Sequence, residues 1–472
     1  MTRIVMYVYN DMRSDARVIR EASLLAAAGH ALTVMARPTD PTSAVGDRET
    51  RAGFEIVRVP VPAAWRFWWT LARFPWRLRG ELLARARRDT RELPAGGGSL
   101  LATLVLIGVA ASWSIVCYPI RLVAGRLRRG HARDVGPLDW LVRWRYAIGG
   151  WAAAAASAAP PAEIEWGHDL SGLAAAVAAR RADPGRRVVY DSHEIYLEAR
   201  SSAEQPAWAR RIVAASERRW IAEVDAVVTV NEALAADLDR RYRRSATAGS
   251  IAVIHNCPAR WTPAPDDGRR LRDRLGLEPS ARIAIHHGVF ARHRGVEELA
   301  AAMLEPGLER LHVVLLGSGP CRAAFDRLAQ DPATGGRLHV LDAVDPDELL
   351  GWLAGADVGV MPIQPTTLNH RLATPNKLFE CLAAGVPVVV SDFPGMRGIV
   401  LEDPAGPLGA VCDPTKPASI AAAIRSIIEL PDVERAALRG RCLTAAHERW
   451  NWETESVPLL EVAARLGPGA GA

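Results

Sequence analysis

The chain has 472 residues, which is enough for two large domains that each bury a full core. Its 49% hydrophobic and 24% charged residues are typical of a globular protein and exclude a disordered or fibrous one. The net charge of +5 is unevenly spread, since residues 61–150 hold 15 Arg against five Asp or Glu, so the basic character belongs to one segment.

The six cysteines are scattered, with no CxxC pair. We interpret them as thiols in a reducing compartment, not as metal ligands or disulfides. The N-terminus becomes polar and acidic too soon for an export signal, so the cytoplasm is the expected location.

The predicted elements begin with a strand at 3–10, a helix at 14–29 and a strand at 30–38. This β-α-β opening predicts a doubly wound parallel sheet. Another strand follows at 54–60, and then the alternation of strands and helices stops until about residue 160.

The interruption combines tryptophan, arginine and one long apolar run. Seven of the 15 tryptophans lie in 61–150, and residues 100–120 are 21 residues without a charged side chain. That length is enough to cross a bilayer. Three interpretations stay open: a full crossing, a re-entrant or interfacial hairpin, and a helix buried against the protein or a partner. A single crossing is disfavoured because both flanks are basic and both halves of the sheet must lie on the same side. A nucleic-acid groove would leave the apolar run unexplained, so association with an anionic membrane surface is favoured.

Polar side chains follow two strands of the first half. His168 and Asp169 end the strand at 163–169, and the strand at 187–191 runs into His193 and Glu194. An open parallel sheet places its ligand-contacting loops at the carboxyl ends of its strands. An exposed histidine at a strand end is more often structural. The position of His193 at the carboxyl end of a buried strand nevertheless makes it a candidate site residue.

The chain then starts over. Residues 259–276 are rich in Pro, Asp and Gly and are expected to link two domains, after which apolar strands alternate with amphipathic helices. This pattern predicts a second parallel sheet covered on both faces. Gly317 and Gly319 follow one of its strands, where a ligand could approach the backbone. No GxGxxG fingerprint follows either domain's first strand, which argues against a nicotinamide-dependent dehydrogenase.

A helix and strand at 374–392 carry the most specific pattern. Thr374 is the predicted N-cap, and Lys377 and Glu380 share one helix face near the N-terminus. Orphan amides and a cation suit a diphosphate, and a carboxylate suits a sugar diol, so the pair suits a nucleotide. The alternative is an ordinary surface ion pair. Lys377 is one of only two lysines among 58 basic residues, which favours a functional role.

Together these segments resemble the family-4 glycosyltransferases. The resemblance is carried by the N-terminal helix that begins near Asp15, the DSHE string at 191–194, the Arg-Gly pair at 294–295 in place of the family's Lys-Gly, and NKLFE at 376–380. It covers most of the chain apart from 61–160. The Gly-Gly loop that many members have after the first strand is missing.

The resemblance implies an α/β GT-B fold, with two doubly wound Rossmann-like domains that face a central cleft. The N-terminal, acceptor-side domain is then expected at 1–258, with a helical, membrane-associating insertion at 61–160. The C-terminal, nucleotide-sugar-binding domain is expected at 259–447, and residues 448–472 form a helix that packs back on the first domain and a frayed tail.

The same resemblance implies a site and a reaction. A nucleotide sugar, expected to be a UDP- or GDP-sugar, donates its sugar to an acceptor hydroxyl with retention at the anomeric carbon and with no obligatory cofactor or metal. His193 is implied to contact the transferred sugar, Lys377 and Arg294 the diphosphate, and Glu380 the ribose. A second glutamate of the family is Leu372 here. The further candidates are Gly317, Gly319, Asn369 and Asn376 on the donor side and Asp15, His168, Asp169 and Glu194 on the acceptor side.

We therefore expect a hexosyltransferase-type enzyme of cell-envelope or lipid-linked glycan synthesis, peripheral or monotopic at the inner face of the plasma membrane through 61–150. Its expected partners are the nucleotide sugar and a glycan or lipid-linked acceptor, and no nucleic acid. The alternative is a catalytically silent, membrane-docked scaffold of the same fold. The sugar, the base, the acceptor and the oligomeric state stay open.

Overall fold

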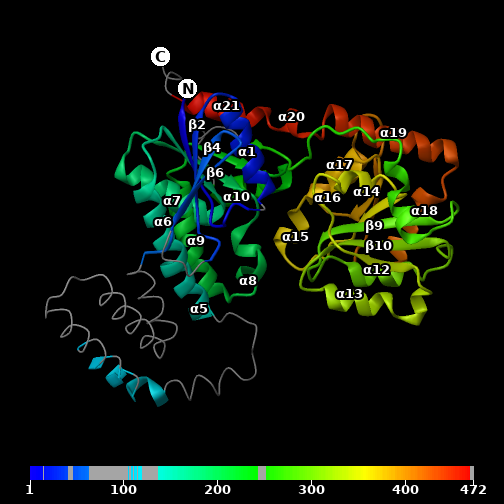
Figure 1. The fold of residues 1–472 in the computed structure, drawn as a ribbon, viewed down its shortest axis with the longest axis horizontal. Helices are drawn as coiled ribbons and strands as arrows, with labels where there is room; N and C mark the ends of the chain where they lie inside the picture. The colour runs from blue at the N-terminus through cyan, green and yellow to red at the C-terminus, as the bar shows by residue number, and fades with distance from the viewer. Residues whose placement is uncertain are drawn as a thin grey trace.

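The computed structural model describes residues 1–13, 15–40, 46–62, 137–242 and 251–467, with short pieces between 105 and 119. Two sheets, each covered by helices, lie beside one another along the long axis of the molecule (Figure 1). The expectation of two doubly wound α/β units is confirmed by this arrangement.

The first sheet has eight strands in the order β3-β4-β2-β1-β5-β6-β7-β8. All of its pairings are parallel except that of β3 with β4. The strand order reverses between β1 and β5, which is the point where such sheets bind ligands. The strands are β1 (Arg3–Tyr7), β2 (Ala31–Ala36), β3 (Asp47–Arg51), β4 (Phe54–Arg58), β5 (Ile164–His168), β6 (Arg187–Ser192), β7 (Ala226–Thr229) and β8 (Ala252–Val253).

The helix after β5 packs very closely on the first sheet. A Cβ at Gly172 would lie 2.2 Å from the Tyr7 carbonyl oxygen, so only glycine lets this helix, α7, approach β1. The described helices of this domain are α1 (Ala16–Ala27), α5 (Pro137–Val142), the π-helix η3 (Arg143–Ile148), α6 (Gly149–Ala158), α7 (Asp169–Ala182), the 3₁₀ turn η4 (Tyr196–Glu198), α8 (Arg200–Ala203), α9 (Ala207–Ile221) and α10 (Glu232–Tyr242).

The second sheet has six strands in the order β11-β10-β9-β12-β13-β14, all paired in parallel. Its order reverses between β9 and β12. Its strands are runs of buried Val, Leu and Ile, as expected for a sheet covered on both faces. They are β9 (Arg282–Val289), β10 (Leu311–Ser318), β11 (Leu338–Leu341), β12 (Val358–Met361), β13 (Val388–Ser391) and β14 (Gly409–Cys412).

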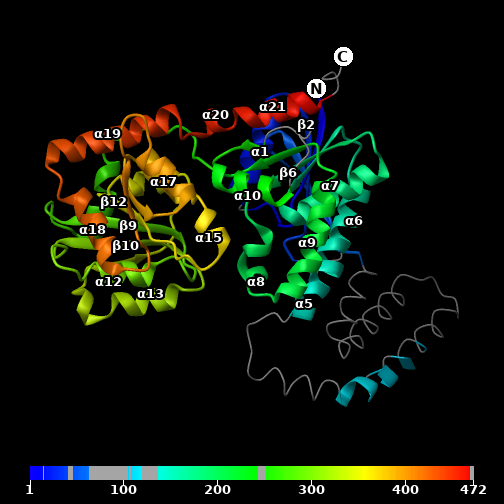
Figure 2. The same ribbon diagram turned by 180° about the vertical axis from the view of Figure 1, so that it is seen from behind.

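Helices flank this sheet, and the last ones lead back to the first domain. The chain leaves the second domain along α19 and returns through α20 and α21, whose Trp452, Leu459 and Val462 share a core with Ile4 and Val34 (Figure 2). The end of α21 therefore lies close to the N-terminus (Figure 1). The helices are α11 (Arg270–Leu275), α12 (Val296–Ala302), α13 (Arg322–Ala329), α14 (Leu349–Leu353), α15 (Leu368–Leu372), α16 (Asn376–Ala383), α17 (Pro394–Leu401), α18 (Pro417–Ile428), α19 (Asp432–Glu448), α20 (Trp452–Glu455) and α21 (Val457–Leu466).

Most of the Trp- and Arg-rich segment lies outside the described residues; of the charge-free run 100–120, the described positions are 105, 108–109, 111–113 and 115–119, all of them helical. At its described end the tryptophans point inward: Trp140 and Trp144, together with Trp151, are buried in the core of the first domain. A membrane-facing role is thus wrong for Trp140 and Trp144, because α5 packs against α9 and the Trp144 ring packs on Tyr196 and Trp220. Within the described residues, no helix has the length and apolar character to cross a membrane.

Candidate active site

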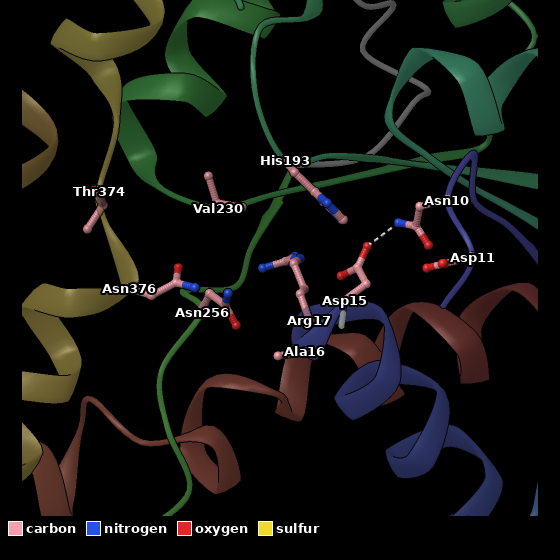
Figure 3. Close-up of a pocket in the computed structure, with 10 residues that line it drawn as sticks. All are labelled: Asn10, Asp11, Asp15, Ala16, Arg17, His193, Val230, Asn256, Thr374 and Asn376. Atoms are coloured by element: carbon pink, nitrogen blue, oxygen red, sulfur yellow. Dashed lines mark hydrogen bonds between the residues drawn. The ribbon is translucent and has the colours of Figure 1, made fainter. Parts of the chain in front are cut away.

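A cavity of about 440 Å³ lies where the two domains meet (Figure 3). His193 reaches into it from the end of β6, while Asp15 and Arg17 come from the start of α1. Thr374 and Asn376, from the second domain, line the opposite side. Of the residues predicted from sequence, the structure therefore brings together His193, Asp15 and Asn376 here.

His193 is held by two carboxylates. Its backbone N–H donates to Asp169 Oδ1 at 3.1 Å, and its ring nitrogens lie 3.4 Å from Asp191 Oδ2 and 3.8 Å from Asp169 Oδ2. Burial lowers the pKa of His193, but Asp191 and Asp169 outweigh it and raise the pKa to about 10. The ring is therefore an imidazolium at neutral pH, able to donate a hydrogen bond to a sugar hydroxyl or a phosphate oxygen.

A buried ionic network lies beneath His193. Arg17 Nε is 2.8 Å from Glu21 Oε1, and another guanidinium nitrogen is 3.2 Å from Asp191 Oδ1. All three side chains are at most 4% exposed. Burial raises the pKa of Glu21 well above its usual value, whereas Arg17 and His193 overcome burial and hold the pKa of Asp191 well below its own. Arg17 thus fixes the charge of the carboxylate that supports His193.

His168, at the end of β5, joins this network. Its Nδ1 lies 3.3 Å from His193 Nε2 and 3.4 Å from Asp191 Oδ2. The ligand atoms of His168, Asp191 and His193 lie within 4.8 Å of one another, so in the part of the chain that the structure describes this group could hold a metal ion. The Arg17 guanidinium already neutralises Asp191, which works against a cation. That no metal is required stays a prediction.

The first turn of α16 differs from the sequence expectation at one residue. The predicted N-cap role of Thr374 is wrong: its hydroxyl donates to the Gly395 carbonyl at 2.7 Å, and the cap position belongs to Pro375. The Thr374 hydroxyl is bound to the first turn of α17 and does not cap α16. The helix therefore begins at Asn376, and Lys377 stays in its first turn.

Lys377 and Glu380 point to different partners, although they share one helix face. Lys377 Nζ lies 3.3 Å from His286 Nε2, and Glu380 Oε2 lies 2.8 Å from His287 Nε2. Across the described residues, the two charged groups form no ion pair with each other. Burial, aided by Arg294, lowers the pKa of Lys377 to about 8, whereas His287 overcomes burial and lowers that of Glu380.

Sequence reasoning missed the two histidines. His286 and His287 lie in the second half of β9, the strand at which the second sheet reverses its order. Adjacent histidines at the carboxyl end of a parallel strand were the available signal. Both are buried, and they hold the cation and the carboxylate of α16 from below.

Arg294 lies on the loop after β9. His293 has φ +65° and Gly295 has φ +76°, and a Cβ at Gly295 would lie 1.9 Å from the Pro362 carbonyl oxygen. The loop therefore has a fixed shape. Arg294 is half-buried in the wall of a second cavity, of about 740 Å³, which His193 also lines. Arg292 lines the same cavity but is exposed.

Asn369 and Glu194, one predicted on each side of the cleft, contact each other. Asn369 Oδ1 accepts from the Ile195 N–H at 3.2 Å, and its amide donates to Glu194 Oε2 at 3.3 Å. Nearby, the Asn231 amide donates to the Leu372 carbonyl at 2.8 Å. The side chain of Asn369 is therefore committed to a bridge between the domains, and of the two predicted asparagines only Asn376 lines the 440 Å³ cavity.

Gly317 and Gly319 are explained by packing. A Cβ at Gly317 would lie 1.9 Å from the Gly288 carbonyl oxygen, and one at Gly319, with φ +151°, would lie 2.6 Å from the Phe290 carbonyl oxygen. Neither lines the cavities described above. Their small size is needed for the close approach of the backbones after β9 and β10.

Part of the chain matches a known protein family, and curated proteins of similar sequence are known. Residues 281–430 match the family model described as "Glycosyl transferases group 1". The matched residues all lie in the second domain. A D-inositol 3-phosphate glycosyltransferase of Xylanimonas cellulosilytica is 27% identical over 310 residues, covering 63% of this chain and 70% of that protein. A GDP-mannose-dependent alpha-(1-6)-phosphatidylinositol monomannoside mannosyltransferase of Mycolicibacterium smegmatis is 28% identical over 300 residues, covering 60% and 71%.

Solved structures of glycosyltransferases share the two-domain arrangement. A sucrose-phosphate synthase of Thermosynechococcus elongatus superposes with a TM-score of 0.63 at 18% identity, covering 99% of each chain. Anabaena HepE in complex with UDP-glucose gives a TM-score of 0.59 at 14% identity, covering 98% of this chain and 100% of that one. The segment that matches the group 1 model and the domain before it thus form the GT-B fold.

Proposed function

We propose that this chain is a retaining glycosyltransferase that takes a hexose from a nucleoside diphosphate sugar. The acceptor hydroxyl oxygen forms the new bond to the anomeric carbon, the bond from that carbon to the diphosphate oxygen breaks, and the hydroxyl proton leaves to the diphosphate or to solvent. A UDP- or GDP-sugar is the proposed donor, since one relative is named as GDP-mannose-dependent and one structural neighbour was solved with UDP-glucose.

One observation carries the proposal: the cation and carboxylate of α16 are each held by a histidine of β9, instead of by each other. A surface ion pair has no need of such support. We assign the donor diphosphate to Lys377, Arg294 and the amides that begin α16, and the ribose to Glu380. Negative charge develops on the departing diphosphate, so cations aimed there stabilise the transition state.

His193 is assigned to the transferred sugar. It lines both interdomain cavities, and its imidazolium is a hydrogen-bond donor at the junction between them. Asp15, His168, Asp169 and Glu194 then belong to the acceptor half, where His168 and Asp169 act by orienting His193.

The test is transfer by the purified full chain. Each UDP- and GDP-hexose is incubated with candidate glycan and lipid acceptors, products are detected by mass spectrometry, and proton NMR of the first product gives its anomeric configuration. The proposal expects turnover with one donor class and a product of the donor's configuration. An inverted product would contradict retention, and absence of turnover with every donor would favour the silent scaffold.

We also propose a cytoplasmic location at the plasma membrane and a role in envelope or lipid-linked glycan synthesis, through the basic residues 61–150. Sedimentation with anionic vesicles at low and high salt tests the contact. Binding should fall as salt rises, because phosphate-headgroup attraction is screened. Equal binding to neutral vesicles would contradict it.

A further inference from the structure

A third cavity, of about 340 Å³, opens within the first domain beside the transfer centre. It shares Asn10 with the His193 cavity and Glu194 with the larger interdomain cavity. We call it the aromatic–arginine pocket; its principal walls are Tyr9, Arg37, Trp140, Arg143, Trp144 and Tyr196.

The aromatic wall is held in place by other rings. Trp144 packs on Tyr196 with ring centroids 5.4 Å apart and on Trp220 at 5.7 Å. Tyr9 meets Trp151 edge-on at 5.3 Å. Such packed rings make a preformed surface for the apolar face of a sugar or polyol.

Two arginines contribute the charge of the pocket. Arg37 follows β2, and its guanidinium lies 5.7 Å from the Tyr9 ring centroid. Arg143 is the first residue of the π-helix η3. Within the described ranges, neither arginine forms an ion pair with a carboxylate. Burial raises the pKa of Tyr9 and both arginines oppose it, so both guanidinium groups lie within electrostatic reach of one hydroxyl.

The local backbone is unusual at this point. A π-helix is rare, and short π segments are frequent at functional sites. Here η3 supplies Arg143, Trp144 and Ile148 to the pocket. The single acid of the wall, Glu194, is at the side shared with the larger cavity, where it accepts from Asn369. The wall thus combines two cations with one acid, and the neighbouring cavity shares that acid.

We propose that the aromatic–arginine pocket is the acceptor subsite and that it selects an acceptor carrying a phosphate group. The phosphate lies between Arg37 and Arg143, whose planar forks suit its oxygens, and the polyol hydroxyls face Asn10 and Glu194 towards His193. This inference rests on the proposed transferase function. The phosphate can belong to a soluble phosphorylated polyol or to a lipid headgroup, since both present the same oxygens.

The test compares matched ligands and matched variants of the full chain. myo-Inositol 3-phosphate and myo-inositol are titrated by calorimetry, and phosphatidylinositol in phosphatidylcholine vesicles is the lipid arm. The variants are Arg37→Gln, Arg143→Gln and, as the control, Arg145→Gln, which removes an equal charge from the same π-helix at a residue that does not line the pocket.

We expect the phosphorylated ligand to bind wild type and Arg145→Gln with the same affinity. Its affinity for Arg37→Gln and for Arg143→Gln should be at least about tenfold lower, because a charged hydrogen bond is lost. If binding depends on the two arginines with the soluble ligand alone or with the lipid vesicles alone, the result identifies the source of the phosphate. Equal binding of myo-inositol, equal loss in Arg145→Gln, or no binding in either arm would overturn the proposal. Thermal shifts with UDP and GDP on the same samples test the proposed transferase function separately. If the nucleotide still binds but the phosphorylated ligand does not, only the proposal for the acceptor subsite is overturned.

Discussion

The ammonium nitrogen of Lys377 lies 3.3 Å from Nε2 of His286, whose Nδ1 is 2.9 Å from the Val360 carbonyl oxygen. A carbonyl can only accept, so Nδ1 carries the proton and Nε2 offers a lone pair to Lys377. Burial, followed by the charge of Lys377, lowers the pKa of His286 well below its usual value and keeps it neutral. A neutral histidine therefore aims the cation without neutralising it.

The first prediction concerns pH. Because the pKa of Lys377 is lowered to about 8, the ammonium is present below that pH and is lost above it. A diphosphate binds the charged form, so donor affinity should fall by up to about tenfold per pH unit above pH 8. Calorimetry with the nucleoside diphosphate across that range measures it. Lys377→Arg should flatten the profile, and an unchanged fall in that variant would refute the assignment.

The second prediction separates two arginines of one loop. Arg294→Ala should lower kcat by about 10²-fold to 10³-fold, because a cation aimed at the leaving diphosphate is removed. Arg292→Ala, an exposed neighbour in the same cavity wall, should stay within a few-fold of wild type. Steady-state kinetics with saturating donor compares them. The reverse ranking would assign the diphosphate to Arg292.

The third prediction concerns His193. His193→Ala should abolish transfer while sparing nucleotide binding, because the ring serves the sugar and not the diphosphate. Turnover and calorimetry with the free nucleotide, on one preparation, provide both readings. Loss of nucleotide binding together with turnover would indicate a structural role, through Asp191 and Asp169, in place of a catalytic one.

The fourth prediction concerns stability. Arg17→Met removes the guanidinium that pairs with the buried carboxyl groups of Glu21 and Asp191 and should cost about 3–5 kcal/mol of unfolding free energy. Arg181→Met breaks a partly exposed pair with Glu223 and should cost about 1 kcal/mol or less. Urea titrations give both values. A similar loss of unfolding free energy in the two variants would show that the ionic network under His193 contributes no more than an exposed ion pair.

Local patterns were enough to predict the sheets and the helix of Lys377. Apolar runs and helical spacing are properties of neighbouring residues, and they led to two doubly wound sheets and to α16 in nearly its observed place. His193 was found from its place after a buried strand. The roles assigned to the site residues remain predictions.

Contacts between distant elements could not be predicted from the sequence. The pairing of His286 with Lys377 depends on how β9 lies under α16, and the bridge from Asn369 to Glu194 depends on how the domains meet. Trp144 beside arginines fits both a membrane interface and a core, and only its burial distinguishes the two. A glycine such as Gly317 after a strand likewise suits either a ligand or a close backbone contact.

Central to the proposed function is that a nucleotide sugar binds at the start of α16 and gives up its sugar to the acceptor while bound there. Thermal shifts of wild type and Lys377→Ala with UDP-, GDP-, ADP- and TDP-sugars test it most directly, with Lys416→Ala, an exposed lysine, as the control. The account predicts that one nucleotide class stabilises wild type and Lys416→Ala and that this stabilisation is lost in Lys377→Ala. Stabilisation by none of them, or equal stabilisation of Lys377→Ala, would contradict it.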